Sequence, residues 1–133
     1  MHEILFRGKR IDNGEWFVGF YGKSGEKTYI IYDNDIAVAY VSMKEVIPET
    51  IGQYTGLTDK NGKKIFEGDI VVVYARGYHT VCTVSWAETV AHFQLWQINT
   101  IPKTSTNLNL GNYDCEVIGN IHDNPELLKG GAE

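Results

Sequence analysis

Three acidic side chains near the centre of the chain have the residue types for acid–base chemistry or for Mg²⁺ binding. Glu67 and Asp69 flank Gly68, and Asp59 lies on the preceding predicted hairpin. Paired carboxylates can exchange protons or coordinate a hard cation. However, the sequence places no His or Lys to complete such a site, and carboxylates in turns commonly accept hydrogen bonds from local amides. We therefore favour a structural role for these carboxylates, and an enzyme that uses Asp59, Glu67 and Asp69 is the less favoured hypothesis.

The four histidines and two cysteines lack the spacing of a metal site. His79 and Cys82 are three residues apart, and on a strand this spacing directs them to opposite faces. The sequence contains neither a C-x₂-C nor an H-x₃₋₅-H pair. No serine has a G-x-S-x-G context, and residues 52–56 lack the Gly-Lys-Ser/Thr of a phosphate loop. The sequence therefore predicts no catalytic residue, metal or cofactor, and we expect Cys82 and Cys115 to be small core residues.

Basic and aromatic residues gather in a way that single-stranded nucleic acid can use. The basic residues form two groups, Arg7, Lys9 and Arg10, and Lys60, Lys63 and Lys64. Aromatic rings near them in the second half are Tyr54, Tyr74, Tyr78, Trp86 and Trp96. Bases can stack on such rings. Lysines are also ordinary at hairpin tips, and the net charge is −5 with a pI of about 5.3. That charge opposes attraction to nucleic acid or to an anionic membrane.

Length and composition are those of an ordinary globular protein. A chain of 133 residues forms one domain or two small ones, and can bury enough surface to need no metal or disulfide. No basic segment followed by an apolar run opens the chain, and no apolar run is long enough to span a membrane. We therefore expect a cytoplasmic location with free cysteines.

The centre of the chain carries the clearest signals of local structure. Asn61-Gly62 predicts a hairpin with a two-residue type I′ turn, because that turn needs positive φ at both central residues. Asp59 is placed to accept a hydrogen bond from the turn backbone. A second turn is predicted around Gly68. Residues 70–74 then form an apolar strand that we expect to be covered on both faces.

Short runs of high β propensity alternate with polar turns along the rest of the chain. The runs predicted as strands are residues 4–7, 16–21, 28–32, 36–41, 80–86, 92–98 and 113–121. Both faces of the run 16–21 are apolar, so we expect cover on both of its sides. Residues 43–46 fit either a helical turn or an extended piece. Residues 99–112 are polar and without period, which predicts a long loop, and residues 125–128 fit one helical turn.

Together these elements predict an all-β or β-dominated fold, α+β at most. Residues 1–50 are expected to form a hairpin-rich sheet. Residues 51–128 are expected to form a partly closed, SH3-like barrel that contains the central hairpin. Residues 129–133 are expected to be a flexible tail. No internal repeat is visible beyond the recurring turn chemistry.

Three segments of the chain resemble the YopX family. They are residues 4–10 continuing into 12–16, residues 50–62 running into 66–71, and residues 116–127. This resemblance spans the domain and implies a β-rich fold and a phage or prophage origin. It brings no activity with it, and no catalytic or binding residue is carried over.

These observations favour a phage or prophage accessory protein that acts as a non-enzymatic interaction module. Its partner is expected to be a host or phage protein, or a second copy of the chain. The alternative is a module that binds single-stranded nucleic acid on the barrel half. The matched residues are mostly of turn and core types, which is why an activity is not predicted.

Overall fold

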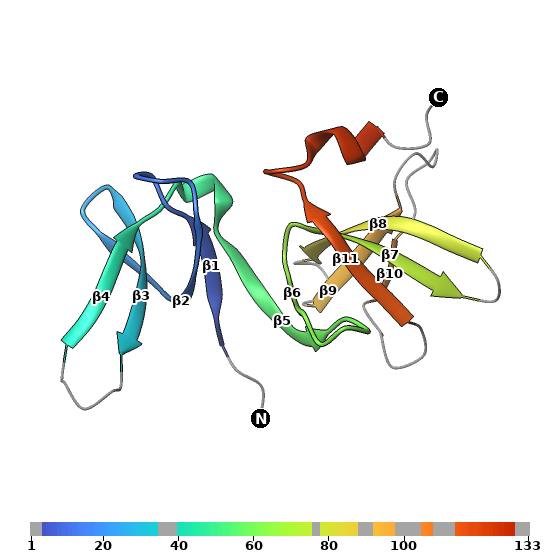
Figure 1. Ribbon diagram of the computed structural model, residues 1–133, viewed down its shortest axis with the longest axis horizontal. Helices are drawn as coiled ribbons and strands as arrows, with labels where there is room; N and C mark the ends of the chain where they lie inside the picture. Colours follow the sequence, from blue (N-terminus) through green and yellow to red (C-terminus); the bar gives the residue numbers. More distant parts are fainter. Residues whose placement is uncertain are drawn as a thin grey trace. The chain divides into compact units, whose positions relative to one another are not determined.

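A computed structural model describes residues 4–34, 40–75, 78–87, 92–97, 105–107 and 114–129. Strands dominate them, and the only helical pieces in these ranges are two short 3₁₀ turns. This confirms the β-dominated fold (Figure 1). The chain divides into two compact units, which we call unit 1, Met1–Tyr54, and unit 2, Thr55–Glu133. No helix in the described ranges has both the length and the apolar character needed to cross a membrane.

Unit 1 is an antiparallel meander whose last strand returns to its first. Its elements are β1 (Phe6–Lys9), β2 (Trp16–Ser24), β3 (Lys27–Asn34), β4 (Tyr40–Glu45), the 3₁₀ turn η1 (Pro48–Thr50) and the start of β5 (Gly52–Thr58). The strand order is β4-β3-β2-β1-β5, and β5 continues beyond unit 1 to pair with β6. The end of β4 is also joined to the end of β1. Ile47 N–H donates to the Lys9 carbonyl at 2.8 Å, and Ile11 N–H donates to the Glu45 carbonyl at 3.1 Å.

Strand β2 pairs with two neighbouring strands and changes partner after Gly19. Its first half pairs with β1 up to Gly19, and its second half pairs with β3 from Phe20 onward. A Cβ atom on Gly19 would overlap the carbonyl oxygen of Ile31 and lie 3.1 Å from the Ile30 side chain. Ile30 is completely buried. Glycine therefore permits the close approach of β3 at this corner.

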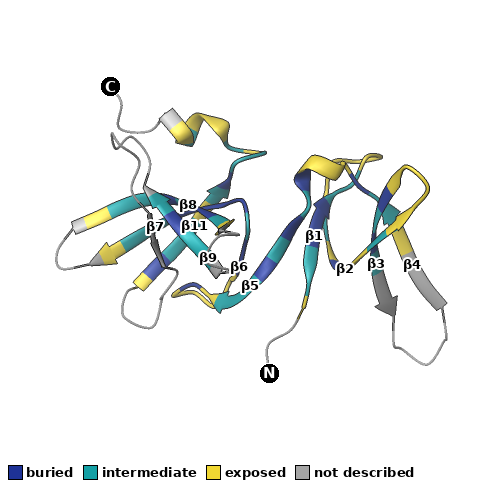
Figure 2. Cartoon of the chain, turned by 180° about the vertical axis from the view of Figure 1, so that it is seen from behind, coloured by how far each residue is buried: buried dark blue, intermediate teal, exposed yellow. Residues whose placement is uncertain are grey.

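Unit 2 repeats the same strand order with different residues. Its elements are the end of β5, β6 (Lys64–Phe66), β7 (Asp69–Ala75), β8 (Tyr78–Ala87), β9 (His92–Gln97), β10 (Ser105–Asn107), β11 (Asp114–Asn120) and the 3₁₀ turn η2 (Pro125–Lys129). The order β10-β9-β8-β7-β11 again brings the last strand beside the first. The core is formed by Ile65, Val71, Cys82, Val84, Leu95 and Cys115. Figure 2 shows buried stretches of the strands in dark blue. Within the described residues this sheet ends in two edge strands, β10 and β11, and does not close. The SH3-like character of the expected partly closed barrel stays a prediction.

These elements decide one open alternative and correct other expectations. Residues 43–45 belong to β4, so the extended alternative is confirmed, whereas the 3₁₀ turn that begins at Pro48 was not predicted. The polar segment 99–112 was expected to be a loop, but residues 105–107 form a strand paired with β9. The rest of that segment, and most of the predicted strand 36–41, lie outside the described residues. The helical turn at 125–128 is confirmed as the 3₁₀ turn η2.

The expectation that β2 is covered on both faces was wrong. Phe20 is 52% exposed, Tyr21 is 44% exposed and Val18 is 38% exposed. These side chains alternate between the two faces of the strand. Each face of β2 therefore presents apolar surface to solvent.

The β2 corner yields a prediction about stability. Replacing Gly19 with Ala should lower the free energy of unfolding of unit 1 by about 1–3 kcal/mol, because the added methyl group must displace the β3 backbone. Urea denaturation followed through NMR signals of unit 1 measures this change. Gly25→Asn is the control, since Gly25 has φ of 63° with nothing within 4 Å of an added Cβ, and Asn tolerates this conformation. Equal stability of Gly19→Ala and the native chain would contradict the assignment.

Candidate functional site

The central hairpin between β5 and β6 has a three-residue loop. Asp59 N–H donates to the Lys63 carbonyl at 2.8 Å, and Gly62 N–H donates to the Asp59 carbonyl at 2.9 Å. Gly62 has φ of 83°, which is the left-handed conformation that glycine adopts without strain. The hairpin is thus confirmed, but the predicted two-residue loop at Asn61-Gly62 was wrong. Lys60 is also part of the loop. Three-residue hairpin loops are common when a turn is followed by a residue in the left-handed conformation.

Asp59 holds this loop and a distant strand with one buried carboxylate. Its Oδ1 accepts hydrogen bonds from the amides of Asn61 and Lys63, both at 2.9 Å. Its Oδ2 accepts from the amide of Val117 on β11 at 3.0 Å. Burial raises the pKa of Asp59, but the amides of Val117, Lys63 and Asn61 together outweigh it, so the pKa is below its ordinary value. The hydrogen bonds from these amides therefore stabilise the charged form of the Asp59 carboxylate.

Asp69, another of the three candidate carboxylates, has a similar role. Asp69 is 1% exposed, and its Oδ2 accepts from the amide of Phe66 at 2.8 Å across the turn at Gly68. Glu67 in the same turn is half-buried. Across the described ranges, no group of three or more His, Cys, Asp or Glu side chains is placed to hold a metal ion. Asp59 and Asp69 thus each bind the backbone of a turn.

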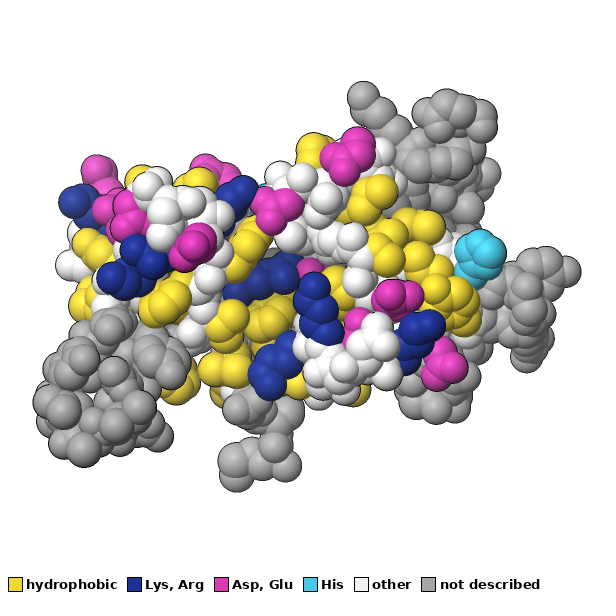
Figure 3. Space-filling view, viewed as in Figure 1, with side chains coloured by type: hydrophobic (Ala, Val, Ile, Leu, Met, Phe, Trp, Pro, Cys, Tyr) yellow, Lys and Arg dark blue, Asp and Glu magenta, His cyan; other side chains and the backbone are white. Residues whose placement is uncertain are grey.

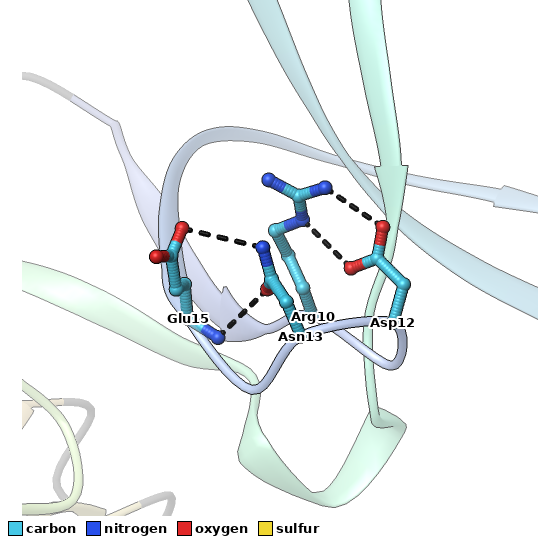
Figure 4. Close-up of polar contacts among 4 residues, drawn as sticks. All are labelled: Arg10, Asp12, Asn13 and Glu15. Carbon is cyan, nitrogen blue, oxygen red and sulfur yellow. Dashed lines mark hydrogen bonds and ion pairs between the residues drawn. The ribbon is translucent and has the colours of Figure 1, made fainter.

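The basic residues of the first group are engaged locally. Arg10 donates through Nε and Nη2 to the two carboxylate oxygens of Asp12 at 3.0 and 2.7 Å (Figure 4). This interaction lowers the pKa of Asp12 from its ordinary value. Arg7 is 9% exposed, with its guanidinium 4.7 Å from the centre of the Trp16 ring. These two arginines therefore contribute little to an open basic surface.

The aromatic residues of unit 2 do not form one stacking surface. Trp86 shares the core face of β8 with Cys82 and Val84 and contacts Phe93 edge-on at 4.9 Å. Tyr74 alternates with the core residues of β7 and lies on the other face. The Lys60 ammonium lies 4.7 Å from the Tyr74 ring centre and 3.8 Å from the Glu116 carboxylate. Binding of single-stranded nucleic acid stays a prediction of the sequence alone.

Unit 1 contains an open cavity with mostly apolar walls. Its volume is about 190 Å³, and it is lined by Phe6, Tyr21, Lys23, Thr28, Pro48 and Ile51. The rings of Phe6 and Tyr21 form part of the wall, with centroids 5.6 Å apart and a tilt of 43°. Strands β1, β2 and β3 and the turn η1 each supply part of the lining. Concave apolar sites with a few polar groups are the usual form of a binding site.

The opposite face of the same sheet carries an exposed apolar row. Phe20, Ile31 and Met43 lie directly opposite one another on β2, β3 and β4. Phe20 is 52% exposed and Met43 is 50% exposed. Hydrophobic side chains reach the surface over this unit (Figure 3). Unlike the lining of the cavity, which includes Lys23 and Thr28, this row consists of apolar side chains alone.

The sequence did not identify the cavity residues as a site. They come from positions between 6 and 51, and only the strand order brings them together. The one signal in the sequence was a strand, residues 16–21, with two apolar faces, which was interpreted as burial. The structure shows instead that Tyr21 on one face and Phe20 on the other are exposed.

The fold defines the class of protein as a two-unit, all-β protein in which two antiparallel meanders have the same strand order. The chain belongs to the YopX family, because the model of that family, described as YopX protein, matches residues 6–129. This confirms the resemblance found in the sequence. The match covers strands β1 to β11 and the turn η2.

A solved structure has a similar fold. The crystal structure of protein EF1440 from Enterococcus faecalis aligns with a TM-score of 0.59 and 23% sequence identity. The alignment covers 96% of this chain and 99% of that one. Comparison with curated proteins gives no match. At this identity the likeness concerns the fold alone.

The Asp59 carboxylate yields a prediction about pH and stability. Asp59→Asn keeps one oxygen acceptor and turns an NH₂ group toward an amide donor, which should cost about 2–3 kcal/mol. A carboxyl whose pKa is lowered by folding contributes stability above its ordinary pKa, and loses it as the pH falls through the folded value. The native chain should therefore lose stability below about pH 4, and Asp59→Asn should lose less over that range.

Denaturant unfolding at a series of pH values measures both effects. Asp114→Asn is the matched control, since Asp114 is an exposed residue on β11, and should change neither the stability nor the pH profile appreciably. An Asp59→Asn protein as stable as the native chain, with the same acid profile, would show that the three hydrogen bonds do not support unit 2.

The two cysteines yield a prediction about reactivity. Cys82 and Cys115 are 3% and 2% exposed, and burial raises the pKa of each to about 11. They lie on the two strands that flank β7, so their Cα atoms are about 10 Å apart, beyond the reach of a disulfide. A thiol reagent at about pH 8 should react with neither in the folded chain and with both after denaturation. Rapid labelling of either cysteine under native conditions would contradict this.

Proposed function

We propose that the protein is a non-enzymatic accessory module, of phage or prophage origin, that binds a segment of another protein in the cavity of unit 1. We place this action in the bacterial cytoplasm. The observation that carries the proposal is the open apolar cavity between Phe6, Tyr21, Pro48 and Ile51. Asp59 and Asp69, the best candidates for acid–base chemistry, support the non-enzymatic part because each is bound to backbone amides.

The size of the cavity favours a peptide side chain over a whole small molecule. Sites for drug-sized ligands and cofactors have volumes of roughly 300–1,000 Å³, whereas this cavity has about 190 Å³. That space accommodates one bulky apolar side chain, while the rest of the bound segment lies outside. Recognition of an extended segment by pockets for individual side chains is a recurring mode of peptide binding.

The exposed wall of the cavity is of the residue type that contributes most to protein binding. Tyr21 is 44% exposed and packs against Phe6. Tyrosine gives a large rigid contact area at a small entropic cost, and it is enriched among the residues that dominate binding energy. Pro48, which also lines the cavity, begins the turn η1. Its ring restricts the backbone of this part of the cavity wall. A partner side chain can therefore enter without a large rearrangement of the site.

The test is selection of binding peptides from a random displayed library on the immobilised full chain. Enriched peptides are then synthesised and their affinities measured by fluorescence anisotropy. Tyr21→Ser should weaken binding by about tenfold or more, the loss expected when an aromatic anchor of an interface is removed. Phe20→Ser is the matched control, because Phe20 is the neighbouring and similarly exposed aromatic residue on the other face of β2. It should leave binding unchanged.

Three results would contradict the proposal. One is the absence of any enriched peptide. Another is equal binding to the native chain and to Tyr21→Ser. A third is loss of binding in Phe20→Ser alone, which would move the binding surface to the row of Phe20, Ile31 and Met43. Sedimentation at several concentrations shows whether that row joins two copies of the chain instead.

A further inference from the structure

The cavity that the proposed function uses also has two polar residues in its lining, Lys23 and Thr28. Lys23 is the one charged residue among the six that line it. Lys23 and Thr28 lie directly opposite each other on β2 and β3, so their side chains are neighbours on the same face. The apolar walls and the polar side of the cavity are therefore adjacent.

Thr28 is unusual because it is buried in a cavity that is open. It is 3% exposed and its side chain lines the cavity. A threonine hydroxyl can both donate and accept a hydrogen bond. A ligand that offers an oxygen or an N–H group beside the apolar pocket can therefore bind this hydroxyl.

Lys23 brings a positive charge to the lining of the cavity. The Lys23 side chain is exposed and makes no ion pair with any described acidic residue. None of the other five lining residues carries a charge. A cation beside an apolar pocket attracts a carboxylate and repels a second cation, and such charge complementarity gives specificity to an interface.

We propose that the cavity recognises an extended peptide segment in which a bulky apolar residue is next to an acidic residue. The apolar side chain occupies the space between Phe6, Tyr21 and Pro48. The neighbouring carboxylate pairs with the Lys23 ammonium, and a peptide backbone group hydrogen-bonds the Thr28 hydroxyl. This inference rests on the proposed function and adds the chemistry of the partner.

The experiment uses the peptides enriched on the full chain, each synthesised in three forms. The first is the selected sequence, the second has the acidic residue replaced by Gln, and the third has it replaced by Lys. Binding of the first form should weaken as the salt concentration rises. The Lys form should bind the native chain about tenfold more weakly than the selected form, since attraction is replaced by repulsion.

Reversal of the protein charge provides the decisive comparison. In Lys23→Glu the preference should invert, so that the Lys form of the peptide binds better than the acidic form. Lys27→Glu is the matched control, because Lys27 is an equally exposed lysine at the start of β3 whose cross-strand partner, Ser24, is on the other face. Thr28→Val should weaken all three forms to a similar extent, because it removes only the hydroxyl.

The outcomes distinguish the two proposals. Enriched peptides with no preference for acidic residues, or with affinities that Lys23→Glu and Lys27→Glu change equally, overturn this inference while leaving the proposed function intact. Absence of peptide binding overturns both. Inversion of the preference in Lys23→Glu alone supports both.

Discussion

The structure of unit 2 depends on one buried carboxylate that joins two segments far apart in the chain. Asp59 accepts amide hydrogen bonds from both sides of its own loop and from Val117 on β11. Without this carboxylate, three amide donors in partly buried positions would lack acceptors, and each such loss is expensive. The loop geometry, the pairing of the β5–β6 hairpin and the position of β11 are therefore set together by a single side chain.

This dependence explains why the segments that resemble the YopX family contain turn residues. Asp59, Gly62 and Gly68 fall in the matched segment around residues 50–71, and Val117 falls in the last matched segment. Two of these residues adopt positive φ, at 83° for Gly62 and 93° for Gly68. Their side-chain chemistry, or the absence of a side chain, determines the backbone path. The family resemblance is therefore a resemblance of fold.

The sequence predicted local structure better than it predicted assembly. The turns at Gly62 and Gly68 follow from glycine and asparagine chemistry over a few residues. Cys82 and Cys115, expected as small core residues, both lie in the core of unit 2. Strand order could not be predicted, because pairing of β5 with β1 joins residues far apart in sequence. The strand at 105–107 was missed because Thr- and Asn-rich segments carry no hydrophobic period.

The candidate site was missed for a related reason. A strand with two apolar faces has the same pattern whether it is buried or is exposed at two binding surfaces. Only the exposed fractions of Phe20 and Tyr21 separate these cases.

The equivalence of the two units was also invisible in the sequence. Both are four-stranded meanders with a fifth strand that returns to the first, but different residues fill the equivalent positions. Topology can recur without a recognisable repeat of residues.

The separation of Asp59 from Val117 by 58 positions has a consequence for folding during synthesis. All strand partners of unit 1 leave the ribosome within the first 54 residues, so this unit can fold early. The Asp59 carboxylate in the central hairpin must instead wait until Val117 on β11 has been translated. Until then β7, which pairs with β11, has an open edge, and an open edge invites pairing with the wrong chain. The nascent protein is therefore most vulnerable to aggregation before β11 is translated, when unit 1 can already be folded and β7 still lacks this partner.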